Sequence, residues 1–274
     1  MGALPFLRTI VRPSAALVRS TVLELLILTV HVLLYPTGLA QERRPPPPPA
    51  VAGPRGDQEG DGEDRPPVLL LHGFIDNRSV FVLLRRSLRR HGWQHVLTLN
   101  FSLLTCDVRA AAELLARHVE EVCDRTGSPQ VDVVGHSLGG LIARYYVQRM
   151  GGDARVRMLV TLGTPHAGTH LAGIVPGHPL ARQMRPDSEI VAELGEPAPQ
   201  CGTQFVSFWS DLDLIMIPVE TARIDHPDLI SRSVRVSGVG HLALPVHTEV
   251  AVGIRQALTM AETTDGRAGA ASVA

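Results

Sequence analysis

Residues 131–144 constrain the fold of this chain more than any other part of the sequence. They read VDVVGHSLGGLIAR, which is an apolar run, then Gly-x-Ser-x-Gly centred on Ser137, then helix-forming residues. A serine at a sharp turn between a buried strand and a helix needs small neighbours, because side chains two residues away would clash. Gly135, Gly139 and Gly140 meet that need. The pattern therefore predicts a nucleophile elbow, and it fits better than an ordinary helix N-cap serine.

Apolar runs that are typical of buried strands alternate with helix-like periodic segments between residues 66 and 262. The expected strands are 68–71, 95–99, 131–134, 157–162, 204–208 and 233–236. The expected helices are 81–90, 107–126, 141–150 and 249–259. Such alternation predicts an α/β fold, in which a mostly parallel central sheet is flanked by helices through right-handed crossovers.

An N-terminal hydrophobic helix is expected within residues 1–42. Residues 21–40 are mostly apolar, interrupted by Glu24 and His31, and follow a basic flank. They fit a signal peptide cut after Ala40 or an uncleaved membrane anchor, and the length of the run favours the anchor. A third interpretation, a soluble amphipathic helix packed on the domain, is kept open by the two polar interruptions.

The basic flank holds the N-terminus inside in both membrane interpretations, so the rest of the chain is expected outside the cytoplasm, anchored or secreted. Residues 43–65 contain five consecutive prolines and then a Gly/Asp/Glu-rich stretch, which predicts a linker. The catalytic domain is expected at 66–262, and residues 263–274 as a disordered tail.

Composition excludes some classes of function. The formal net charge is -1, so no basic field points to nucleic acid. The 274 residues, 45% of them hydrophobic, suffice for one domain of ordinary size with extensions, which we expect to be a monomer. The three cysteines lack the paired close spacing of a zinc site. We predict no metal and no cofactor.

The groups that a serine nucleophile requires occur later in the sequence. His241 follows a predicted strand and a glycine, a position from which an imidazole can act as general base for Ser137. Asp213, in the loop after strand 204–208, is predicted to orient the histidine, with Asp211 as the reserve. The alternative histidines, each expected to be structural, are His166, His170, His226 and His247.

A second backbone donor is expected after the first strand, where the chain reads His72-Gly73-Phe74. A glycine there lets the chain turn an N–H toward the serine, so the amides of Phe74 and Leu138 are the predicted oxyanion hole. His72 is expected to orient this loop by hydrogen bonding rather than to transfer protons.

Several motifs together resemble the bacterial lipases and esterases of the α/β-hydrolase superfamily, especially membrane-anchored or secreted actinobacterial-type proteins described as triacylglycerol lipases. The resemblance covers about residues 66–260. It rests on His72-Gly73-Phe74, Gly135-His136-Ser137-Leu138-Gly139-Gly140, Leu162-Gly163-Thr164-Pro165-His166-Ala167-Gly168-Thr169, Ser210-x-x-Asp213 and Gly240-His241.

The resemblance implies an α/β-hydrolase fold and hydrolysis of carboxylic esters, of lipids or small molecules, through an acyl-enzyme. The residues expected to bind substrate are His72, Gly73, His136, Thr164 and Pro165. Residues 170–201, where such enzymes carry a lid, are few and rich in Pro, Gly and charge, which favours shorter or unusual esters over long-chain fats. Acyl transfer to an acceptor other than water, or a scaffold without turnover, remain alternatives.

Overall fold

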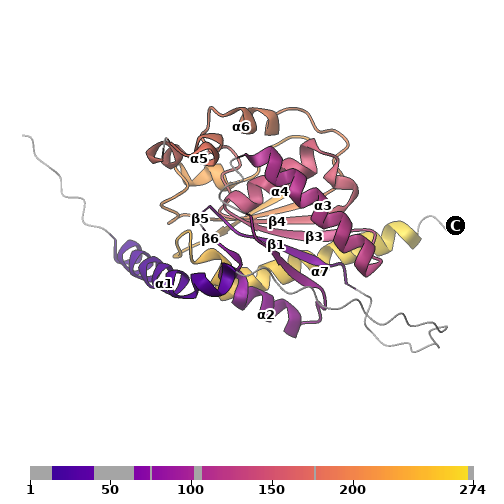
Figure 1. Ribbon diagram of the computed structural model, residues 1–274, viewed down its shortest axis with the longest axis horizontal. Helices are drawn as coiled ribbons and strands as arrows, with labels where there is room; N and C mark the ends of the chain where they lie inside the picture. Colours follow the sequence, from indigo (N-terminus) through magenta and orange to yellow (C-terminus); the bar gives the residue numbers. More distant parts are fainter. Residues whose placement is uncertain (1–13, 40–64, 75, 102–106, 176, 271–274) are drawn as a thin grey trace, which may run out of the picture.

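A single sheet of six parallel strands lies at the centre of the molecule (Figure 1). The computed structural model describes residues 14–39, 65–74, 76–101, 107–175 and 177–270. The strand order is β2-β1-β3-β4-β5-β6, and every neighbouring pair is parallel, as the sequence predicted. The strands are β1 (Val68–Leu71), β2 (Val96–Leu99), β3 (Val131–His136), β4 (Val156–Leu162), β5 (Gln204–Ser210) and β6 (Ile230–Val236).

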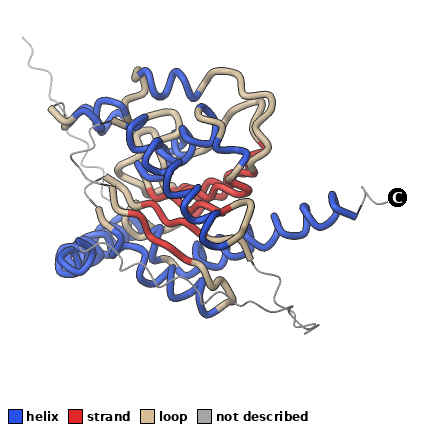
Figure 2. The backbone as a smooth tube through the Cα atoms, turned by 45° about the vertical axis from the view of Figure 1, so that its right-hand side comes forward, coloured by secondary structure: helices blue, strands red, loops and turns tan. Residues whose placement is uncertain are grey.

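Helices cover both faces of the sheet, so each face has its own apolar core (Figure 2). On one face lie α3 (Val108–Thr126) and α4 (Leu138–Arg149), and on the other α2 (Val82–Arg90) and α7 (Thr248–Ala270). Strands covered on both sides are expected to be apolar throughout, and β1, β3 and β4 are buried along their whole lengths.

The helix boundaries follow from capping residues. Asp107 accepts hydrogen bonds from the backbone N–H groups of Arg109 (2.7 Å) and Ala110 (3.2 Å), which begins α3. Gly127, with φ 72°, ends it in the left-handed conformation that glycine adopts without steric cost. Both residues bound the helix that the sequence predicted.

Two boundaries differ from the sequence-based expectation. Helix α4 begins directly after Ser137 rather than at residue 141, because Gly139 and Gly140 lie inside its first turn instead of preceding it. Helix α7 continues to Ala270, past the expected domain end at 262 and into the segment expected to be a disordered tail. That segment contains no proline, so no residue in it blocks a helix outright, although Gly266 and Gly269 lower its helix propensity.

The first helix, α1 (Ala15–Leu39), lies beside the sheet domain near α2 (Figure 1). Within the described residues it is the one helix long and apolar enough to cross a membrane, over Ala15–Pro36. Its C-terminal half is tied to the domain, since Asn77 donates to the carbonyl of Tyr35 (2.9 Å) and Asn100 to that of Gly38 (2.7 Å). The predicted linker falls at 43–65, of which only Arg65 is among the described residues.

Candidate active site

Ser137 occupies a strained turn between β3 and α4. Its φ of 52° and ψ of -121° make it the single non-glycine residue with positive φ in the described part of the chain. Such backbone strain persists only where surrounding contacts fix it. Here the Ser137 N–H donates to the carbonyl of Leu162 (2.9 Å), and the Thr164 hydroxyl donates to the Ser137 carbonyl (3.0 Å).

The three glycines beside Ser137 have no room for a side chain. A Cβ at Gly135 would lie 2.5 Å from the Cα of Gly140, and one at Gly139 would lie 2.4 Å from the carbonyl oxygen of Leu71. A Cβ at Gly140 would lie 2.0 Å from the Thr164 hydroxyl. The glycines that predicted the turn in the sequence are therefore required by the close packing of β1, β3 and α4.

We expect Gly139→Ala to destabilise the protein by about 1–3 kcal/mol, because the added methyl meets backbone atoms that cannot rotate away. Urea unfolding of the variant measures the loss. Gly202→Ala is the matched control, since a Cβ there meets nothing within 4 Å. A Gly139→Ala variant as stable as the control would contradict the close packing of this turn.

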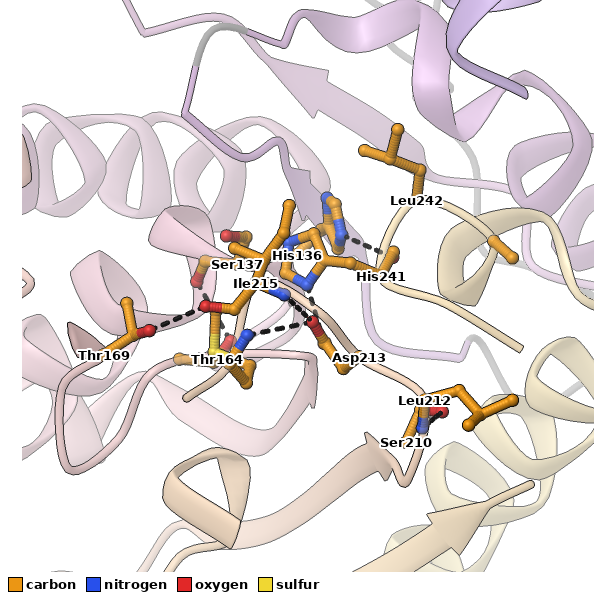
Figure 3. Close-up of polar contacts among 12 residues, drawn as sticks. His136, Ser137, Thr164, Thr169, Ser210, Leu212, Asp213, Ile215, His241 and Leu242 are labelled. Carbon is orange, nitrogen blue, oxygen red and sulfur yellow. Dashed lines mark hydrogen bonds and ion pairs between the residues drawn. The ribbon is translucent and has the colours of Figure 1, made fainter. Parts of the chain in front are cut away.

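His241 and Asp213 form a buried pair at the same edge of the sheet (Figure 3). The Nδ1 of His241 lies 2.7 Å from Oδ2 of Asp213. The other carboxylate oxygen, Oδ1, accepts the backbone N–H groups of Ile215 (2.9 Å) and Met216 (3.0 Å). Both oxygens of Asp213 thus accept hydrogen bonds. These bonds fix the carboxylate, which in turn holds the Nδ1 edge of the imidazole.

Asp211, the reserve for the acid, lies elsewhere. Its carboxylate pairs with Arg235 at 2.7 Å on the surface. The structure therefore brings Asp213, and not Asp211, against His241.

Burial and charge act in opposite directions on this pair. Burial acts to lower the pKa of His241, but the combined effect of Asp213 and, to a smaller degree, Glu24 and Asp76 raises it above 6.5. Burial works to raise the pKa of Asp213, while His241 and the two backbone N–H donors hold it below 3.8. Both shifts favour an ionised carboxylate beside a basic imidazole.

His136, the residue before Ser137, connects the elbow to the histidine loop. The rings of His136 and His241 have centroids 4.7 Å apart, and the Nε2 of His136 lies 3.2 Å from the His241 carbonyl oxygen, to which it donates. Figure 3 shows both imidazoles beside Ser137. The serine and the histidine, 104 positions apart in the sequence, thus belong to one cluster.

The loop after β1 passes close to the serine. A Cβ placed on Gly73 would lie 3.1 Å from Cβ of Ser137, so Gly73 packs against the serine and Phe74 is the next residue along this loop. His72 makes two hydrogen bonds beside this loop: its Nε2 accepts the N–H of Phe101 (3.1 Å), which leaves the proton on Nδ1 to bond the Gly73 carbonyl (2.9 Å). Burial lowers the pKa of His72, in keeping with a neutral ring.

The remaining residues expected to bind substrate are buried. The Thr164 hydroxyl donates to the carbonyl of Ser137, and the His136 ring donates to the carbonyl of His241. Pro165, the residue after Thr164, is buried. Thr164 and His136 are therefore held by contacts within the site. Among the alternative histidines, His166 bonds Thr161 (2.9 Å) inside the fold.

The segment between β4 and β5 folds over α3 and α4 as three short helices, η3 (His170–Ile174), α5 (Pro179–Gln183) and α6 (Glu189–Leu194). Glu193 bonds the Tyr145 hydroxyl (2.6 Å) and pairs with Arg109, and Arg144 donates to the Leu194 carbonyl (2.9 Å). The ring of His178 packs edge-to-face on Phe74, with centroids 4.9 Å apart. This segment is therefore tied down next to the candidate oxyanion loop.

Two acidic residues at the site were not foreseen as part of it. Asp76 lies with Oδ2 3.5 Å from the Nδ1 of His136. Glu24, from α1, accepts the backbone N–H groups of Leu242 and Ala243, both at 2.9 Å. The only sequence signal for Glu24 was a charge within an otherwise apolar helix.

A six-stranded parallel sheet with a strained serine between strand and helix, and a histidine–carboxylate pair at the same edge, defines the α/β-hydrolase fold. Residues 66–185 match the family model described as the alpha/beta hydrolase fold. The fold expected from the motifs is confirmed.

The curated relatives are bacterial lipases. The chain is 32% identical over 119 residues to a triacylglycerol lipase of the actinobacterium Pseudarthrobacter phenanthrenivorans, a match that covers 40% of this chain and 36% of that protein. The chain is also 32% identical over 119 residues to a triacylglycerol lipase of Burkholderia plantarii. This match covers 40% of this chain and 32% of that protein. The match thus spans about a third of the length of these relatives.

Among solved structures, the mature lipase BlEst2 of Bacillus licheniformis superposes with a TM-score of 0.57. The match covers 70% of this chain and 94% of that one, at 14% identity. At this identity the likeness establishes the fold alone.

Proposed function

We propose that this chain is a serine hydrolase that cleaves carboxylic esters of lipids through an acyl-enzyme. Ser137 is the nucleophile, His241 the general base, and Asp213 the carboxylate that orients His241. The observation that carries the proposal is the buried pair of His241 and Asp213, 2.7 Å apart, at the edge of the sheet where Ser137 is held with φ 52°. A structural serine gains nothing from such strain, whereas a nucleophile must project from the turn.

The reaction follows from these positions. Because Nδ1 of His241 is bonded to Asp213, Nε2 is the ring nitrogen left to accept the hydroxyl proton of Ser137. The serine oxygen attacks the ester carbonyl, and the amides of Phe74 and Leu138 stabilise the oxyanion. His241 then gives the proton to the departing alkoxide. Water, activated by the same imidazole, hydrolyses the acyl-enzyme and restores the serine.

The substrate class rests on the lipase relatives and on the tied-down segment between β4 and β5. Its anchoring by Glu193 and Arg144 favours esters of short or medium acyl chains over long-chain fats. The test is hydrolysis of 4-nitrophenyl esters of increasing chain length. We expect kcat/KM to be greatest for the shorter chains, and no ester hydrolysis at any length would contradict the proposed function.

The alternative acyl acceptor is tested in the same assay. Adding a short alcohol reveals whether the acyl group passes to water or to the alcohol. A hydrolase releases mainly free acid at modest alcohol concentration. Ester as the main product would instead favour an acyltransferase with the same three residues.

We expect kcat/KM to fall as the pH drops through an apparent pKa above 6.5. His241 must be neutral to accept a proton, and its pKa is raised mainly by Asp213, against the lowering effect of burial. A pH profile from 5 to 9 measures this acidic limb. If the residual activity of Asp213→Asn shows the limb at an unchanged pH, the pairing of these two residues is not what sets it.

Membrane association is proposed for α1. Its apolar length and the basic flank before it support attachment of α1 to a membrane, and a spanning α1 would place the domain that follows outside the cytoplasm. The contacts of Glu24 through Gly38 with the domain occupy about 21 Å of helix at 1.5 Å per residue, which leaves too little of α1 to cross a bilayer of about 30 Å. In this arrangement α1 lies along the membrane surface. Flotation of the full chain with anionic vesicles tests it.

A further inference from the structure

The turn that follows His241 is held by a residue from the other end of the chain. The two carboxylate oxygens of Glu24 accept the consecutive backbone N–H groups of Leu242 and Ala243, each at 2.9 Å. These are the first two residues after the candidate base. The carboxylate thus caps the turn in the way an acidic side chain caps the exposed N–H groups at the start of a helix.

The loop is shaped to receive this side chain. A Cβ on Gly240 would lie 2.4 Å from Cδ and 2.5 Å from Cγ of Glu24. Glycine at the position before His241 is therefore explained by the approach of Glu24. On the inner side of the same loop, the carbonyl of His241 accepts a hydrogen bond from His136 (3.2 Å).

The buried positions of α1 lie along one side of the helix. Ser20, Glu24, His31 and Gly38 recur at helical spacing, and three of them are buried while Glu24 is half-buried. The opposite side carries exposed apolar residues such as Leu26 and Leu33. The charge in the apolar stretch is thus placed on the docking side.

We propose that Glu24 is a positioning residue for His241 and that α1, which carries it, stays docked on the catalytic domain in the working enzyme. The proposal rests on the proposed role of His241 as base. It implies that removal of the chain up to Ala40 by a signal peptidase would take away part of the active site.

The charge of Glu24 also acts on the base itself. The charged or titratable groups facing His241 are Asp213, Glu24, Asp76 and His136. Glu24 adds to the raised pKa of His241, after Asp213. Loss of this charge should lower that pKa, so the acidic limb of the pH profile should move to lower pH. A residue that served only to attach α1 to the domain would affect stability but would leave the pH of the acidic limb unchanged.

The test compares Glu24→Ala and Glu24→Gln with Leu26→Ala, a control on the exposed side of the same helix. In Glu24→Ala we expect kcat to fall about 10- to 100-fold with little change in KM, as for a displaced catalytic group. Glu24→Gln keeps the shape and one acceptor oxygen, so its loss should be smaller, with the acidic limb displaced as in Glu24→Ala. Leu26→Ala should match the wild type.

Hydrogen exchange of the full chain supplies an independent readout. Peptides covering residues 238–246 should exchange faster in both Glu24 variants, while peptides from β3 keep wild-type protection. The proposal would be overturned if Glu24→Gln had the kcat, pH profile and hydrogen exchange of the wild type. Should Glu24→Ala fail to fold, Glu24→Gln alone is the test. If the wild-type protein hydrolyses no ester, the proposed function fails, while exchange at Leu242 and Ala243 still tests the contact.

Discussion

Ser137→Ala is expected to lower turnover of esters at least about 10³-fold, the scale of triad knockouts in serine hydrolases. The variant loses the hydroxyl that forms the acyl-enzyme, and no other group at the turn can replace it. Alanine keeps the Cβ and therefore the backbone strain at φ 52°, so the fold and its stability should change little. Initial rates on the best 4-nitrophenyl ester, with circular dichroism of the same sample, measure both effects.

The control for this variant is Ser237→Ala, which removes an exposed hydroxyl just before the histidine loop. We expect it to keep wild-type activity. Activity of Ser137→Ala within tenfold of the wild type would mean that another residue is the nucleophile, and the proposed mechanism would be wrong.

Asp213→Asn is expected to lower kcat by about 10³- to 10⁴-fold, while Asp211→Asn leaves it near the wild-type value. The amide of asparagine cannot stabilise the imidazolium of His241 and favours the wrong tautomer of the ring. Asp211, by contrast, makes a surface ion pair with Arg235, and such pairs contribute about 0–1 kcal/mol. The two aspartates lie two positions apart, which makes the pair a matched comparison.

Steady-state kinetics of both variants decides between the carboxylates. Equal losses would show that the loop after β5 as a whole matters rather than the contact with His241. A greater loss in Asp211→Asn would assign the acid to the other residue.

The elbow and the sheet could be predicted because their signals are local. Gly135, Ser137 and Gly139 report a turn whose close contacts involve the residues beside them, and buried parallel strands read as short apolar runs. The same local signals indicated that Asp213 and His241 follow strands, and their order after Ser137 suggested them as candidates for the acid and the base.

What could not be predicted depends on contacts between distant segments. Glu24 lies more than 200 positions from Leu242, and its role follows only from how α1 packs on the finished domain. The contact between the rings of His136 and His241, whose centroids lie 4.7 Å apart, also joins segments that are distant in the sequence. Asp76 offered no pattern at all, since a single aspartate in a loop is indistinguishable from a solvated one.

The most direct test of the central claim is to react the purified full chain with a fluorophosphonate and locate the adduct by tandem mass spectrometry. Trypsin releases residues 126–144, which contain Ser128 and Ser137. We predict one adduct per chain, on Ser137, and its loss in His241→Ala. A folded protein that remains unlabelled, or an adduct on any other residue, would contradict the assignment of this turn as the site of an activated serine.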